Sequence, residues 1–183
     1  MYTFILNSIF FGFALFTLIR VIFRAVSNQH NVVFSSEVEG AASLLVRLAG
    51  ILFLFGFASD VITMFLEANS DESLYRVEDR MFGKYWYGFW IWPFVYFFLV
   101  QFLWLPGFRR SPVYRFVLAL MILGCHFYES FVTYLTNLNR DYLPTSWTMS
   151  PSRIVLNELA SIGTFSILLL VVIFLRSRYF KAN

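Results

Sequence analysis

Five long apolar stretches limit what this chain can fold into more than any other feature of its sequence. A helix needs about 20 apolar residues to cross the hydrocarbon core of a bilayer, because each residue adds about 1.5 Å. The five stretches reach this length and cover residues 4–26, 41–67, 85–106, 113–137 and 155–177. The sequence therefore predicts an all-α membrane protein with five transmembrane helices.

The composition and the start of the chain agree with this prediction. Hydrophobic residues make up 59% of the 183 residues and charged residues only 14%, a balance that is too apolar for a water-soluble domain. The first stretch has no positively charged start, and no small-residue cleavage site precedes Arg20. These features favour an uncleaved transmembrane helix over a signal peptide.

The distribution of basic residues predicts the orientation. One set of ends carries Arg20, Arg24, Arg47, Arg109, Arg110, Arg115, Arg176, Arg178 and Lys181, and the other carries Arg76, Arg80, Lys84, Arg140 and Arg153 together with an acidic loop over residues 67–79. Cytoplasmic ends of membrane helices are enriched in Lys and Arg. We therefore expect a bacterial inner-membrane protein with its N-terminus outside and its C-terminus in the cytoplasm. The net charge of +3 reflects this topology, and no basic groove with interleaved aromatics indicates nucleic-acid binding.

Two local patterns refine the expected helices. Leu74, Val77 and Met81 recur at helical spacing among charged residues of the outer loop. This spacing predicts either a short helix in the plane of the lipid headgroups or an ordered loop that contacts a partner. Pro93 falls inside the third stretch and should kink that helix.

The ionisable residues inside the predicted spans are the candidate site. Asp60, His126 and Glu129 each cost roughly 2.5 to 3.5 kcal/mol in hydrocarbon, so a helix that keeps them usually has a use for them. Helical rise places all three in the outer half of the membrane. His126 and Glu129 are i,i+3 neighbours that could act as a proton acceptor and its orienting partner, and Tyr128 adds a hydroxyl. The alternative is that these groups only hold helices together.

Cysteine and histidine usage limits the cofactors that the chain can bind alone. Cys125 is the single cysteine, so neither an intrachain disulfide nor a cysteine-ligated iron–sulfur cluster can form. His30 and His126 fall at different predicted depths, which argues against a haem held by both. We expect no metal site and no cofactor bound by this chain alone.

Several segments of the chain follow one another in a characteristic order. They are Ser59-Asp60, Phe82-Gly83-Lys84-Tyr85-Trp86-Tyr87-Gly88-Phe89-Trp90, Gln101-Phe102-Leu103-Trp104, Glu129-Ser130-Phe131-Val132-Thr133 and Leu138-Asn139-Arg140-Asp141-Tyr142-Leu143-Pro144-Thr145-Ser146-Trp147. Over residues 41–177 the chain thereby resembles one four-helix bundle of the NrfD/polysulfide-reductase-type membrane subunits, and especially the large membrane subunits of alternative complex III. The most specific run extends from Arg140 to Trp147. The expected organisation is an N-terminal helix in residues 1–30 and a four-helix bundle in residues 41–183.

The resemblance implies a subunit of a respiratory complex that oxidises quinol or menaquinol. Haem and iron–sulfur clusters would then belong to partner subunits, one of them an iron–sulfur or cytochrome subunit docked on the outer face. Arg140 and Asp141 would shape the quinol pocket or that docking loop. The chain has one bundle where family members usually have two, and Asn139 and Ser130 stand where a histidine and an arginine are expected.

Three functions follow from these observations. The first is an accessory, half-size subunit that supports assembly or the quinol environment, with Asp60, His126, Glu129 and Tyr128 around the quinol. The second is a purely structural scaffold that contacts other subunits and lipids. The third, a small transporter or proton channel, needs polar residues in both halves of the membrane, and the inner half offers little besides Arg47.

Overall fold

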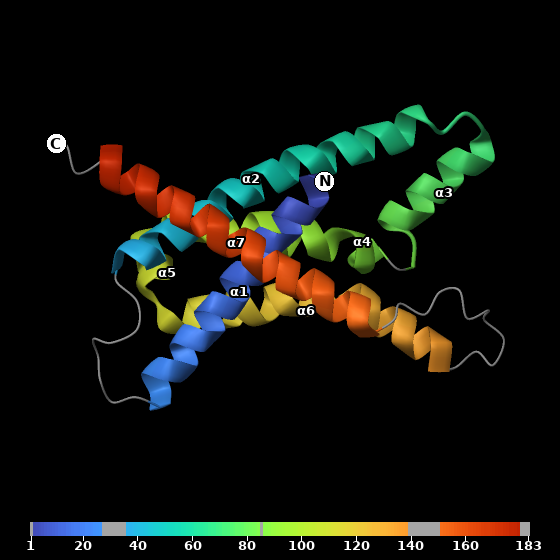
Figure 1. The fold of residues 1–183 in the computed structure, drawn as a ribbon. Helices are drawn as coiled ribbons and strands as arrows, with labels where there is room; N and C mark the ends of the chain where they lie inside the picture. Colours follow the sequence, from blue (N-terminus) through green and yellow to red (C-terminus); the bar gives the residue numbers. More distant parts are fainter. Residues whose placement is uncertain (1, 27–35, 85, 139–150, 180–183) are drawn as a thin grey trace.

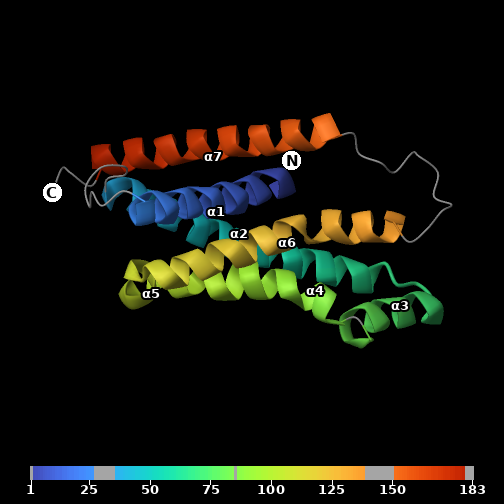
Figure 2. The ribbon, with the colours of Figure 1, turned by 90° about the horizontal axis from the view of Figure 1, so that it is seen from below.

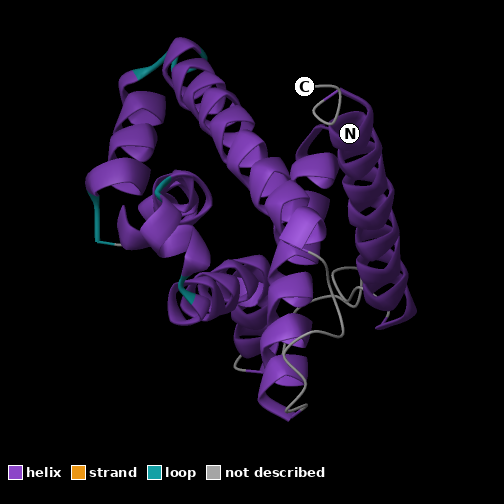
Figure 3. Ribbon diagram, turned by 90° about the vertical axis from the view of Figure 1, so that its left-hand side faces the viewer, coloured by secondary structure: helices purple, strands orange, loops and turns teal. Residues whose placement is uncertain are grey.

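A computed structural model describes residues 2–26, 36–84, 86–138 and 151–179, with the side chains of 24–26, 36, 129–138, 151–154 and 179 excepted. The elements are α1 (Tyr2–Val26), α2 (Ser36–Leu66), α3 (Asp71–Phe82), α4 (Trp86–Pro93), the π-helix η1 (Phe94–Leu99), the 3-10 helix η2 (Phe102–Trp104), α5 (Pro106–Arg110), α6 (Pro112–Leu138) and α7 (Pro151–Tyr179). Figure 3 shows that only short connections in these ranges are not helical. The all-α prediction is confirmed.

Four segments are long and apolar enough to cross a membrane. They are Tyr2–Phe23, Glu37–Leu66, Trp86–Trp104 and Val155–Arg178. Helix α6 is also long, but its apolar part within the described side chains, Pro112–Tyr128, is shorter than a full span. Many large apolar side chains on these helices are exposed, as expected for a surface that faces lipid. A multi-pass membrane protein is thus supported, while a fifth span stays a prediction.

Helix α1 lies in the middle of the assembly. Figure 2 shows α7 on one side of α1 and α6 on the other, with α4 and α5 beyond α6. Phe10, Phe13 and Ala14 of α1 are fully or almost fully buried in a core that also includes residues of α2, η1, α6 and α7. Half of the apolar segment of α1 is buried, against 11% of that of α7.

Helix α1 shares one core with helices of residues 41–183, and the expected division into an N-terminal helix and a four-helix bundle stays a prediction. The physical reason for the shared core is close packing of α1 against α7: Gly12 of α1 lies directly against the ring and Cβ of Phe165. A side chain at Gly12 would hold the two helices apart. Residues 2–26 are therefore part of the core that the other long helices share.

The third apolar segment is not a regular helix. Pro93 ends α4, since proline has no N–H to continue the hydrogen-bond ladder, and the chain continues as the π-helix η1. The structure thus shows a change of helix type at Pro93, and the kink itself stays a prediction. The wider turn of η1 places Val95 and Tyr96 in the core, while Phe94 and Phe98 lie exposed with their rings stacked 5.9 Å apart.

The predicted short helix of the outer loop is also present. Ser70 caps α3: the amide of Ser73 donates to the Ser70 hydroxyl, and the Ser70 amide donates to the Ser73 hydroxyl. At the other end of α3, the indole Nε1 of Trp90 donates to the carbonyl oxygen of Met81 at 2.9 Å. Figure 1 shows α3 folded back beside the end of α2. Its position relative to the headgroups stays a prediction.

Candidate functional site

A cavity of about 1000 Å³ lies between α1, α2, α3, α4, η1 and α6. It is at the same end of the bundle as α3 and the N-terminus of α1 (Figure 2). The residues that line it are Tyr2, Thr3, Leu6, Asn7, Phe53, Gly56, Phe57, Ser59, Asp60, Met64, Arg76, Asp79, Arg80, Gly88, Phe89, Trp92, Tyr96 and Tyr128. Ligand pockets typically reach this size and combine apolar walls with a few polar groups.

Aromatic rings form much of the cavity wall, and they hold one another in place. Tyr96 is the centre of this group: its ring lies 5.3 Å from that of Phe53 and 5.4 Å from that of Trp92, in edge-to-face geometry. Tyr96 also stacks on the buried Phe10 at 4.3 Å. Such pairs are favoured over isolated rings. The aromatic part of the wall is therefore apolar and closely packed, with Tyr96 itself only 1% exposed.

Charged side chains lie on another part of the cavity lining. Asp60 comes from α2, and Arg76, Asp79 and Arg80 come from α3. Arg76 pairs with Glu72 on its own helix. Within the described residues, Asp60, Asp79 and Arg80 form no ion pair. These groups can therefore hydrogen-bond to a polar ligand without losing a salt bridge.

Two small residues bring helices close around the cavity. Gly56 accommodates the ring of Tyr2, whose hydroxyl donates to the carbonyl oxygen of Leu52. Gly88 of α4 lies opposite Tyr128 of α6, and a Cβ placed at Gly88 would lie 3.9 Å from the Tyr128 hydroxyl. The structure thus brings the predicted residues Asp60 and Tyr128 to one cavity.

His126 does not line this cavity. Its Nε2 lies 3.0 Å from Oε1 of Glu158 on α7, and its ring stacks on Phe11 of α1 at 4.6 Å. His126 therefore contacts the helices on the side of α6 away from Asp60. Sequence reasoning missed Glu158 as the partner of His126, and the signal that could have found it is a carboxylate near the start of the last apolar stretch.

Three of the predicted site residues cannot be placed. The side chain of Glu129 lies outside the described residues, although its backbone belongs to α6. Arg140 and Asp141 also lie outside the described residues. Within the described part of the chain, no group of three His, Cys, Asp or Glu side chains could hold a metal ion.

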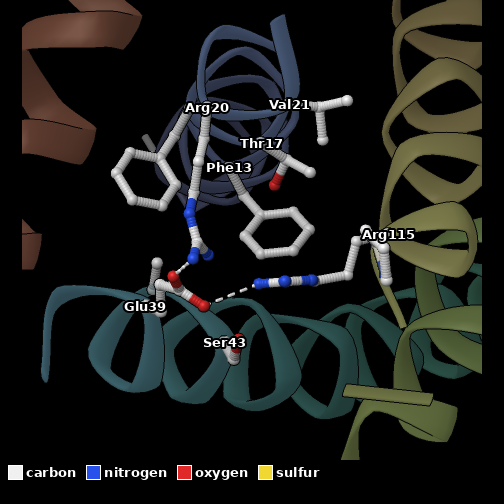
Figure 4. Close-up of a pocket in the computed structure, with 10 residues that line it drawn as sticks. Phe13, Thr17, Arg20, Val21, Glu39, Ser43 and Arg115 are labelled. Carbon is white, nitrogen blue, oxygen red and sulfur yellow. Dashed lines mark hydrogen bonds and ion pairs between the residues drawn. The ribbon is translucent and has the colours of Figure 1, made fainter. Parts of the chain in front are cut away.

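A second polar cluster, at the opposite end of the bundle, was not anticipated. Figure 4 shows Glu39 of α2 between Arg20 of α1 and Arg115 of α6. One carboxylate oxygen of Glu39 pairs with Arg20, and the other lies 2.8 Å from Nη1 of Arg115. We call these three residues the inner triad. Beside it, a cavity of about 20 Å³ has room for about one water molecule.

Arg47 of α2 is the most buried of the described arginines at this end, with 5% of its surface exposed. Its Nε donates to the carbonyl oxygen of Ser43 at 2.8 Å, and its guanidinium lies 4.1 Å from the centre of the Trp104 ring. Gln101 links α2 to η2, since its Nε2 donates to the Arg47 carbonyl and its Oε1 accepts from the Trp104 indole.

These features define a class: an all-helical protein with several helices able to cross a membrane and a large aromatic cavity near one end of the bundle. No protein-family model matches the chain, and no curated protein matches it.

Proposed function

We propose that this chain is an integral-membrane subunit of a respiratory quinol:acceptor electron-transfer complex, similar to alternative complex III, and that its cavity receives the quinol ring. The observation that carries the proposal is the cavity itself, which is lined both by the aromatic residues Phe53, Trp92 and Tyr96 and by Asp60. A quinol is a flat ring with polar oxygens and an apolar tail. The aromatic wall suits the ring, and Asp60 suits a hydroxyl.

The chemistry assigns different roles to the polar groups. Oxidation of a quinol to a quinone releases two electrons and two protons. The Asp60 carboxylate would accept one proton from a quinol hydroxyl, and the second proton would pass to water, while the Tyr128 hydroxyl would hydrogen-bond to a quinol oxygen. A haem or an iron–sulfur cluster in a partner subunit on the outer side would accept the two electrons. His126 then acts through the packing of α6 against α1 and α7, where its contacts lie.

The charges support the proposed orientation in a bacterial inner membrane. Among side chains that the structure describes, the end containing α5 carries seven arginines and two glutamates, whereas the end containing α3 carries three cations and seven carboxylates. Cytoplasmic ends are enriched in Lys and Arg. We therefore place α5 in the cytoplasm and the cavity at the outer half of the membrane, the side on which quinol protons are released.

A structural scaffold is the second candidate, and the exposure of α7 favours it. Only 11% of the apolar segment of α7 is buried, and Leu156, Leu159, Leu170 and Phe174 are all exposed. In a scaffold this face contacts lipids or another membrane subunit, and the cavity takes no part in electron transfer.

Purification through a C-terminal tag in mild detergent tests the first part of the proposal. Mass spectrometry should identify companion subunits, and the optical spectrum should show haem or iron–sulfur absorption. A colourless preparation without companions would contradict membership of a respiratory complex.

Quinol turnover of the purified complex separates the two candidates. Asp60→Asn removes the proposed proton acceptor and should lower turnover at least about tenfold, because general-base catalysis contributes typically about 100-fold or more. Glu78→Gln is the control, since Glu78 lies exposed on α3 and does not line the cavity. Normal turnover of an assembled Asp60→Asn complex would favour the scaffold.

A further inference from the structure

At the α5 end the fold buries a cation that has no counter-ion in the described part of the chain. Arg47 is 5% exposed, and among the described residues no carboxylate forms an ion pair with it. Its guanidinium group donates to the Ser43 carbonyl and lies over the face of the Trp104 ring. A guanidinium stays protonated in proteins, so this site carries a full positive charge.

A second arginine increases the local charge. Arg109 lies on α5 next to Phe108, whose ring is 5.2 Å from that of Phe102 in η2, the element that also carries Trp104, and the like charges of Arg109 and Arg47 repel each other. Burial of an unpaired charge is costly, and a neighbouring like charge adds to that cost. The two arginines therefore form a cationic site between α2 and α5, with Trp104 of η2 beside it.

At the same end of the protein, the other buried arginines have a counter-ion in the inner triad. Arg20 and Arg115 are also partly buried there, but the carboxylate of Glu39 pairs with both. The site at Arg47 and Arg109 lacks such a residue within the described chain. An anion supplied from outside would have the role that Glu39 has in the triad.

The surroundings indicate what kind of anion fits. Trp104, Leu105 and Phe108 are each at least 40% exposed, and Leu48, one residue after Arg47, is also exposed. An anion bound here would thus lie at the border between a cationic site and an apolar surface. Phosphate esters suit guanidinium groups, which can donate two parallel hydrogen bonds.

We propose that Arg47 and Arg109 bind the phosphate of an anionic phospholipid, whose acyl chains lie along the exposed apolar side chains of η2 and α5. Basic pockets between membrane helices on the cytoplasmic side bind lipid headgroups through the same physics. Trp104 would lie at the headgroup level, where tryptophans are enriched. This site is independent of the quinol cavity, which lies at the other end of the bundle.

Lipid binding to the purified full-length chain tests the proposal. Native mass spectrometry would follow titration of the delipidated protein with phosphatidylglycerol and, separately, with phosphatidylcholine. We expect phosphatidylglycerol to bind at least about tenfold more tightly, and Arg109→Gln to remove most of this difference, since one charge-assisted hydrogen bond is worth roughly a factor of ten. Arg178→Gln is the matched control, because it removes an exposed arginine from the same end and should change affinity less than about twofold.

Three results would overturn the proposal: equal binding of the two lipids, equal effects of Arg109→Gln and Arg178→Gln, or full displacement of phosphatidylglycerol by excess inorganic phosphate. The last result would identify a free-anion site. Arg47→Gln is the second variant, and circular dichroism would show whether it folds. If folded, it should lose the preference for phosphatidylglycerol as Arg109→Gln does, and a retained preference would also overturn the proposal.

Discussion

The inner triad makes a quantitative prediction about the stability of the bundle. Glu39→Gln keeps the shape of the side chain but removes the charge that Arg20 and Arg115 share. The side chains of the triad are 13% to 23% exposed, so solvent screens them only in part. Hydrogen bonds to charged groups contribute roughly 1.5 to 3 kcal/mol each, and the Gln oxygen can keep one weakened bond. We therefore expect a loss of about 3 kcal/mol in the free energy of unfolding, the lower limit for breaking a buried ion pair.

Glu72→Gln is the matched control for this variant. It removes the same group from a glutamate–arginine pair, but Glu72 and Arg76 are 76% and 74% exposed. An exposed i,i+4 pair contributes no more than about 0.5 kcal/mol. Unfolding of both variants by SDS in mixed micelles, followed by circular dichroism, gives the comparison. Equal losses for Glu39→Gln and Glu72→Gln would refute the reasoning that burial makes the inner triad strong.

Two further predictions concern helix contacts. Gly12→Ala should lower the free energy of unfolding by about 1 to 3 kcal/mol, because the added Cβ overlaps Phe165. Gly163→Ala is the control, since no atom lies within 4 Å of a Cβ added there, and it should leave the free energy of unfolding unchanged in the same SDS titration. Equal losses for the two variants would contradict the packing argument. Trp90→Phe removes the hydrogen bond to the Met81 carbonyl. Because one such bond contributes about 1 kcal/mol, tryptic cleavage within α3 should become roughly fivefold faster. An unchanged cleavage rate would show that this bond does not hold α3.

Much of the fold could be predicted because helix length and helix boundaries are local properties. The apolar run over residues 155–177 predicted the last helix, and α7 spans Pro151–Tyr179. Pro93 predicted an irregularity in the third segment, and the chain changes from α-helix to the π-helix η1 at the next residue. There the missing N–H of proline acts within one turn.

The central position of α1 could not be predicted, because it depends on which helices pack together. Apolar length shows that a helix can cross a membrane, yet it does not identify its neighbours. The decisive residue is Gly12, which has meaning only once Phe165 of α7 is known to lie against it. A glycine in an apolar helix gives no sign of its partner.

The candidate site was predicted in part for a related reason. Helical rise gives the depth of a residue, and this argument placed Asp60, His126 and Glu129 in one half of the membrane; of the predicted residues, Asp60 and the nearby Tyr128 line one cavity. Depth does not give direction around the helix axis. His126 and Tyr128 are two residues apart, so they point to opposite sides of α6, and His126 contacts Glu158 instead.

The shared carboxylate of Glu39 has a consequence for biogenesis. Arg20 of α1 and Glu39 of α2 leave the ribosome before Arg115 of α6, which follows Glu39 by 76 residues. Helices α1 and α2 can therefore enter the membrane with Arg20 already neutralised, which lowers the cost of insertion. One oxygen of Glu39 then stays available until α6 is synthesised. Arrival of Arg115 completes the triad and marks the point in translation at which the three helices are joined.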